Sequence, residues 1–405
     1  MRVDAATRTG SAVALTVAVL LVAANMRPTI TSLGPLLAQI GTGTGMSAAA
    51  LGLLAAVPLV AWALISPLAH TLSRRFGMAR TVFWSLVLLL AGTIVRSLPG
   101  PVLSLWLGTA LIGAALAIVN VLMPAMIKRE FLRVPLMMAL YTALLSGVGA
   151  VASGVAVPVS QVGPGPGGAG WRFALLIIGA ALLPFAAIAW GIATRRTDGI
   201  HARPTVDSTA HRARTGIWRD RIAWQVAGYM GLQSASFYML VTWLAAYSTS
   251  FGRSEALAGV DVMVYQIFSL AGSLGVPFAL RGRGVRIAPA AIPVLGIIGT
   301  AGLMLAPGGV DLWVAIVGVF SGSSLGMALT LLAQRSRDHD TAAALSGMSQ
   351  SVGYLIAAVG PVVFGAVHAV TGGWIVPLIL LAAVMAGQGV VGIFAARDRF
   401  VLEAS

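Results

Sequence analysis

The 405-residue sequence contains no cysteine and few charged residues. The absence of cysteine excludes disulfides, thiol nucleophiles and thiolate metal ligands. Charged residues make up only 9% of the chain, whereas soluble domains carry about 25%, and the mean hydropathy is +0.92. Apolar runs such as "TVFWSLVLLLAGTIV" are continuous, whereas the strands of a membrane barrel alternate in hydropathy. The sequence therefore predicts an all-α integral membrane protein.

Twelve apolar segments are long enough to cross a bilayer, which takes about 20 helical residues. They cover residues 11–40, 47–73, 79–98, 101–127, 135–161, 171–194, 222–250, 255–280, 286–306, 311–334, 341–370 and 374–396. An arginine-rich polar segment separates the sixth from the seventh. We therefore predict two six-helix bundles, 1–194 and 222–405, joined by a basic linker at 195–221. The linker is interpreted as a solvated tether, with a short interfacial helix near Trp218 as the alternative.

The positive charges lie mostly in alternate loops. A net charge of +14 would suggest nucleic-acid binding in a soluble protein, but short loops account for it here. Lysine and arginine mark the cytoplasmic side of a membrane protein. We therefore expect a bacterial inner-membrane protein with both termini and the linker in the cytoplasm, and no nucleic-acid partner. The opposite loops carry little beyond Arg96, Arg172 and Arg253.

Arg27, in the stretch "AANMRPTITSLGPLL", is the only charged residue between Arg8 and Arg74. An arginine at the centre of a membrane helix costs about 2.5–3.5 kcal/mol, which is tolerable beside a wet cavity. The alternative is that Arg27 ends the helix and snorkels to the interface. However, residues 13–26 are too few to span a bilayer. We therefore predict that Arg27 lines a cavity, where Pro28 kinks the helix.

Polar residues in other spans are candidates for the same cavity. Six spans on each side of the linker suggest two repeated halves, and adding 206 to Arg27 gives Gln233. Residues three or four apart share a helix face, so Thr31 accompanies Arg27, Phe237 accompanies Gln233, and Gln350 accompanies Tyr354. Hydrogen bonding between helices is the alternative for each of them. The predicted substrate-binding residues are Arg27, Asn25, Thr31, Asn120, Tyr141, Gln233, Phe237, Gln350 and Tyr354.

The chemistry of this set indicates what it would bind. A guanidinium offers a planar fork of donors that suits anions, and the first half has no acid inside a span. A doubly charged ligand would need a second cation. We therefore expect a small monovalent anion, or a compact neutral molecule rich in acceptors. The sequence has no His-Glu-x-x-His motif and no pair of interior acids, which argues against an enzyme, a metal or a cofactor, and a receptor would not need polar groups in both halves.

Asp261 is the only acid well inside a span, about 10 Å from the outer face if its helix starts at Ser254–Glu255. A buried carboxylate favours its neutral form and can carry a proton, so Asp261 is the candidate for proton coupling. The alternatives are that it faces an outer vestibule, or that it pairs with Arg96 or Arg253.

Several motifs carry a resemblance to a known family. They are "NMRPTITSLGPLL", "NVLMPAMIKREF", "GLQSASFYMLVTWL" and "AALSGMSQSVGYLIAAVGP". With these motifs the chain resembles the major facilitator superfamily and, within it, the cyanate/nitroimidazole porter family. The resemblance implies a monomeric secondary transporter that works by alternating access, with substrates ranging from cyanate to nitro-substituted heterocycles.

Two stretches depart from common patterns of the superfamily. The loop "HTLSRRFGMAR" places Arg74 where an aspartate is usual, which puts an acid-based latch there in doubt. A proton-coupled drug or metabolite efflux antiporter is the alternative within the superfamily. The fifth span, "SGVGAVASGVAVP", lacks the G-P-x-x-G-G-like run typical of such antiporters.

Overall fold

A computed structural model describes residues 3–163, 168, 170–195, 216–280, 284–337 and 339–403. The first half contains α1 (Val3–Met26), α2 (Pro28–Thr31), α3 (Leu33–Thr44), α4 (Ala48–Phe76), α5 (Met78–Ser97), α6 (Val102–Glu130), α7 (Val134–Ser160), α8 (Gly170–Ala180) and α9 (Leu183–Ala193). The second half contains η1 (Ile217–Arg219), α11 (Arg221–Ser250), α12 (Glu255–Ala279), α13 (Gly284–Leu305), η2 (Pro307–Gly309), α14 (Val310–Gln334), α15 (His339–Thr371) and α16 (Ile375–Ala395). Most of the predicted linker, residues 196–215, lies outside the described residues.

Two predicted spans are broken helices. The first is interrupted at Arg27 and Ser32, which leaves α2 as a four-residue helix between α1 and α3. Pro28 has no N–H to donate to the preceding turn, so the helix cannot continue through it unchanged. The sixth is interrupted at 181–182, just before Pro184. The predicted kink at Pro28 is therefore present as a helix break, and the carbonyl oxygens of Arg27 and Pro28 accept backbone hydrogen bonds from Ile30, Thr31 and Ser32.

Within the described residues, eleven helical segments are long and apolar enough to cross a membrane. The helix α11 is 30 residues long but does not reach the same hydropathy. Its polar residues Gln233, Ser234 and Ser236 are buried against neighbouring helices rather than exposed to lipid. This helix occupies the place of the predicted seventh span, and it packs on α15, α16, α12 and α14 of its own half and on α3 of the other.

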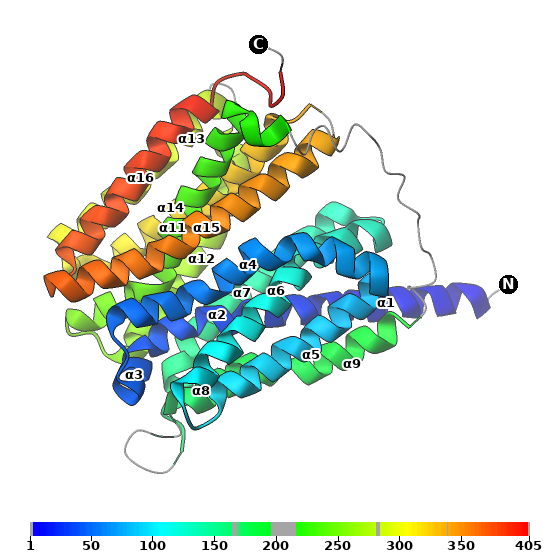
Figure 1. Cartoon of the computed structure of the whole chain (residues 1–405), viewed down its shortest axis with the longest axis horizontal. Coiled ribbons are helices and arrows are strands. Elements are labelled where there is room, and N and C mark those ends of the chain that lie inside the picture. Colours follow the sequence, from blue (N-terminus) through cyan, green and yellow to red (C-terminus); the bar gives the residue numbers. More distant parts are fainter. Residues whose placement is uncertain are drawn as a thin grey trace.

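The two halves form two helix bundles that lie side by side and diverge toward the end at which α1 and α15 begin (Figure 1). They touch through α4 with α15, α7 with α12, and α3 with α11. We call the contact region the closed end and define it by Gly34, Gln39, Gly52, Val241, Glu255 and Pro361. There Gln39 donates a 2.8 Å hydrogen bond to Glu255 across the halves.

Two glycines allow the backbones to approach at the closed end. A Cβ atom at Gly34 would collide with the carbonyl oxygen of Val241, and one at Gly52 with that of Pro361. Small residues let membrane helices pack closely and gain van der Waals contact. The closed end therefore depends on the absence of side chains at these positions.

We expect Gly34→Val to separate the halves at the closed end, because the added side chain meets backbone rather than a movable side chain. Thr242, which is buried beside Gly34, reports this opening as Thr242→Cys, the only thiol in the chain. Maleimide labelling of that thiol should accelerate about tenfold, corresponding to a shift of about 1.4 kcal/mol between the two arrangements. Gly147→Val is the matched control, since nothing lies within 4 Å of a Cβ there. Equal labelling rates in Gly34→Val and Gly147→Val would contradict the expected separation of the halves.

Candidate functional site

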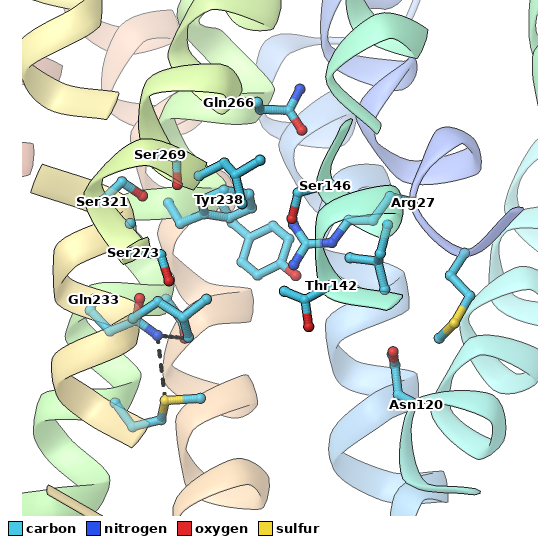
Figure 2. Close-up of a pocket in the computed structure, with 18 of the residues that line it drawn as sticks. Arg27, Asn120, Thr142, Ser146, Gln233, Tyr238, Gln266, Ser269, Ser273 and Ser321 are labelled. Carbon is cyan, nitrogen blue, oxygen red and sulfur yellow. Dashed lines mark hydrogen bonds between the residues drawn. The ribbon is translucent and has the colours of Figure 1, made fainter. Parts of the chain in front are cut away.

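A cavity of about 170 Å³ lies between the two halves, lined by residues from both (Figure 2). The first half supplies Met26, Arg27, Trp62, Asn120, Thr142, Leu145 and Ser146. The second half supplies Met230, Gln233, Ser234, Phe237, Tyr238, Gln266, Ser269, Leu270, Ser273, Ser321, Gly322, Leu325 and Tyr354. None of these lining residues is acidic.

Arg27 is the only charged residue among those that line the cavity. It lies at the break between α1 and α2, and its guanidinium reaches toward Tyr238 and lies near Ser146 (Figure 2). The guanidinium carbon is 5.4 Å from the centre of the Phe237 ring, which belongs to the other half. In the described part of the chain no carboxylate pairs with Arg27. The positive charge is therefore available to a ligand in the cavity.

The broken helix is held in place by α7. The Thr31 hydroxyl donates a 2.7 Å hydrogen bond to the carbonyl oxygen of Gly149. A Cβ atom at Gly149 would lie 2.8 Å from the Cβ of Arg27, so only glycine admits this approach. The position of the Arg27 backbone is thus set by a contact between α2 and α7, and its side chain extends from that anchor into the cavity.

Neutral donors and acceptors form the wall of the cavity in the second half. Gln266, Ser269 and Ser273 lie on one face of α12, and Ser321 of α14 lies nearby (Figure 2). These residues were not among those predicted from the sequence, although the spacing of three and four in α12 places Gln266, Ser269 and Ser273 on one helix face. Gln233 donates a 2.6 Å hydrogen bond to Ser234, which orients its amide.

Gln266 also joins the two halves. Its side-chain nitrogen donates a 2.6 Å hydrogen bond to the hydroxyl of Ser153 in α7. The residue is buried and lines the cavity as well. A ligand that competes for the Gln266 amide would therefore act directly on a bond between the halves.

Aromatic rings enclose the remaining side. Trp62 lies edge-on to Tyr354, with ring centres 5.2 Å apart, and edge-on to Tyr238 at 6.3 Å. Phe237 lies edge-on to Tyr238 at 5.0 Å. Because Trp62 comes from the first half and the others from the second, the aromatic cluster also spans the boundary between the halves. Phe237 and Tyr354 were predicted from the sequence, whereas Trp62 and Tyr238 were not.

Of the nine predicted substrate-binding residues, Arg27, Asn120, Gln233, Phe237 and Tyr354 line the cavity. The other four make hydrogen bonds elsewhere: Asn25 to the carbonyl oxygen of Leu21, Thr31 to Gly149, Tyr141 to the sulfur of Met26, and Gln350 to Ser346. The bonds of Thr31 and Tyr141 join different helices, as the alternative interpretation has it, whereas those of Asn25 and Gln350 lie within one helix. A ligand role for any of the nine stays a prediction.

Asp261 does not line the cavity. Its carboxylate accepts a 2.8 Å hydrogen bond from Arg253, which also binds Asp311 at 2.9 Å. Of the alternatives considered from the sequence, the structure contains the pairing with Arg253. A role in proton coupling stays a prediction. Arg96, assigned to an outer loop from the sequence, instead lies in the last turn of α5, where it is buried.

Comparison with known proteins identifies relatives along the whole chain. Residues 15–361 match the family described as Major Facilitator Superfamily. The chain is 39% identical to the transporter YycB of Bacillus subtilis, covering 95% of this chain and 94% of YycB. It is 36% identical to the 2-nitroimidazole transporter of Escherichia coli, covering 96% of each chain. It is 28% identical to the cyanate transport protein CynX of E. coli, covering 94% and 96%.

Solved structures support the same fold. The nucleoside transporter NupG superposes with a TM-score of 0.74 at 13% identity, covering 94% of this chain and 98% of NupG. An inward-facing bacterial homologue of the lysosomal transporter Spinster gives 0.72 at 17% identity, covering 96% and 94%. At such low identity the likeness concerns the fold alone. The predicted all-α fold of two six-helix bundles is confirmed.

We expect Arg253→Gln to lower the midpoint of thermal unfolding in detergent by several degrees, because Asp261 would remain as a buried carboxylate without its partner. The double variant Arg253→Gln/Asp261→Asn should recover most of the loss, since the stranded charge is removed. Arg172→Gln, at a surface arginine bonded to the carbonyl oxygen of Leu98, is the control. A double variant no more stable than Arg253→Gln would show that this pair does not account for the loss.

Proposed function

The chain belongs to the major facilitator superfamily and is a secondary transporter, and on that premise we propose that it carries a small monovalent anion or a compact neutral molecule rich in hydrogen-bond acceptors. The cargo binds in the cavity between the halves, with Arg27 as its main anchor. Transport across the bacterial inner membrane proceeds by alternating access of a monomer.

The observation that carries this proposal is the single unpaired guanidinium in a cavity whose lining residues include no acid. A guanidinium donates charge-assisted hydrogen bonds, which are stronger than neutral ones. One cation balances one negative charge, so a doubly charged ligand would be only half neutralised. A cationic cargo would meet uncompensated repulsion, which is a means of excluding it.

The rest of the cavity lining favours the same class of cargo. The hydroxyls and amides of Gln266, Ser269 and Ser273 offer neutral donors, and the rings of Trp62 and Phe237 offer flat apolar surfaces. These groups suit a small planar or linear molecule that accepts hydrogen bonds at its edge. Of the two E. coli relatives, the one named for 2-nitroimidazole corresponds to the neutral class of cargo and the one named for cyanate to the anionic class.

Cargo binding would couple to conformation because the cavity draws on both halves. Arg27 belongs to the first half, whereas Gln266 and Phe237 belong to the second. A ligand that contacts both halves favours the arrangement in which they are close, by its difference in affinity for the two arrangements. With the predicted topology, both termini are cytoplasmic and the closed end faces outward, so this conformation is open to the cytoplasm.

We expect Arg27→Gln to weaken cyanate transport strongly. Loss of a charge-assisted hydrogen bond costs about 1.5–3 kcal/mol, corresponding to a rise in KM of about 10- to 150-fold. Arg27→Lys should lose less, because the charge remains although the planar fork is gone. The measurement is uptake of labelled cyanate into proteoliposomes, with Arg172→Gln as the control for a general loss of surface charge.

Uptake of cyanate and uptake of 2-nitroimidazole, measured separately, distinguish the two classes of cargo. If cyanate uptake is saturable and lost in Arg27→Gln, the anionic class stands. If the wild type ignores cyanate but takes up 2-nitroimidazole, the neutral class stands. Normal transport of both by Arg27→Gln would show that Arg27 is structural and would contradict its role as anchor.

A further inference from the structure

Arg96 is a second cation inside the first half. Its side chain lies in the last turn of α5 and the residue is 1% exposed. One terminal nitrogen donates a 2.7 Å hydrogen bond to the carbonyl oxygen of Thr29 in α2. The other terminal nitrogen and Nε are buried without a hydrogen-bond partner. In the described part of the chain no carboxylate pairs with it.

Burying a guanidinium with unsatisfied donors costs free energy unless a hydrogen-bond acceptor or a counter-ion compensates it. Buried charges are ordinarily paired or bound to a counter-ion, and a buried polar group without a partner loses its hydration energy. The hydroxyl of Thr29 is likewise buried and without a partner. Three potential donor atoms, two on Arg96 and one on Thr29, are therefore unsatisfied on two residues that are hydrogen-bonded to each other.

A small cavity adjoins these donors. Arg96, Thr29 and Thr109 line it from the first half, and Tyr238 and Thr242 line it from the second. Its volume is about 10 Å³, at the lower limit for a single water molecule. No acidic residue lines it. In this conformation it is too small for a polyatomic anion.

The wall contributed by the second half belongs to the closed end. Val241 and Thr242 of α11 cover the small cavity, and Val241 is the residue whose backbone meets Gly34. Separation of the halves at the closed end would draw α11 away from α2 and α3. That movement would enlarge the small cavity and open the Arg96 donors to an approaching ligand.

The small cavity also borders the central one. Tyr238 lines both. The four-residue helix α2 begins directly after Arg27 and contains Thr29, so the two guanidiniums flank the same short segment. An anion that leaves one guanidinium for the other would pass beside α2 and Tyr238.

We propose that Arg96, with Thr29, forms a second anion-binding site that is sealed in this conformation and opens when the closed end separates. It takes a small monovalent anion of the kind that Arg27 binds, and exchanges it with the central cavity past Tyr238. This site rests on the proposed function for the identity of its ligand. Its geometry is independent of Arg27.

A purely structural role for Arg96 is the competing explanation. The break in the first span leaves the carbonyl oxygen of Thr29 to be satisfied by a side chain, and Arg96 does so with one nitrogen. A single donor suffices for that role, and it involves no ligand. The two explanations differ in whether substitution affects anion affinity from one side only.

Oriented membrane vesicles provide the test, with KM for cyanate measured separately from each face. We expect Arg96→Gln to raise KM about tenfold at the membrane face on which the closed end lies, and less than about twofold at the other face. The reason is that the site is exposed only when the halves have separated at the closed end. Arg96→Lys keeps the charge and should lie near wild type. Arg172→Gln, at a surface arginine of the same end, should change neither face. Equal changes at both faces, or none, would overturn the proposal.

Thr29→Val covers the case in which Arg96→Gln does not fold. It removes the partnerless hydroxyl while keeping the shape of the side chain, and should raise KM at the closed-end face about threefold. An unchanged KM for a well-folded Thr29→Val would count against the site.

Failure of the proposed function can be told apart from failure of this site. If wild-type vesicles move no cyanate, the unfolding temperature of Gly52→Val is titrated with potassium cyanate, because ligand binding to the folded state raises it. This variant also places a side chain against backbone at the closed end, but Gly52 does not line the small cavity. A saturable rise that Arg96→Gln abolishes and Arg27→Gln retains supports the second site alone. The absence of such a rise, or its loss only in Arg27→Gln, overturns it.

Discussion

The rest of the structure depends on one constraint, a guanidinium that must stay inside the membrane without a carboxylate partner. Arg27 satisfies this constraint by lying at a helix break beside a cavity, where polar side chains surround its charge. The break requires Pro28, and its position requires the contact of Thr31 and Arg27 with Gly149 of α7. Facing neutral donors and aromatic rings belong to the other half, so the same constraint brings the two halves to one site.

The closed end joins the two bundles through close packing and a few polar contacts. Helices in lipid gain little from the hydrophobic effect when they meet, and associate through close packing and hydrogen bonds. Glycines at 34 and 52 permit backbone approach, and Gln39–Glu255 and Gln266–Ser153 add polar links. Contacts of this kind are individually weak, which is compatible with the alternating access that we propose. Asp261 and Arg253 add a charged contact within the second half.

Much of the architecture was predictable because hydropathy reports membrane spans directly. The structural roles of some residues could not be predicted from hydropathy. The helix α11 is polar for a membrane span because its polar side chains are buried inside the protein. Arg96 looks like a loop residue because it ends an apolar run. The serines of α12 were overlooked, since small hydroxyls in a membrane helix more often bond to their own backbone or to a neighbour than to a ligand. Gln350 and Asn25 looked equally suitable, yet each bonds within its own helix.

The sequence by itself determined the class of the protein, its spans, the division into two halves and the single interior cation of the first span. Each follows from a local property, namely the length of an apolar run, the position of a charge or the presence of proline. Tertiary structure alone decided which polar residues share a cavity, that Asp261 pairs with Arg253, and that Arg96 is buried against Thr29. These depend on how helices rotate and pack against partners far away in the chain, and a span's own sequence does not specify the residues that its neighbours will present.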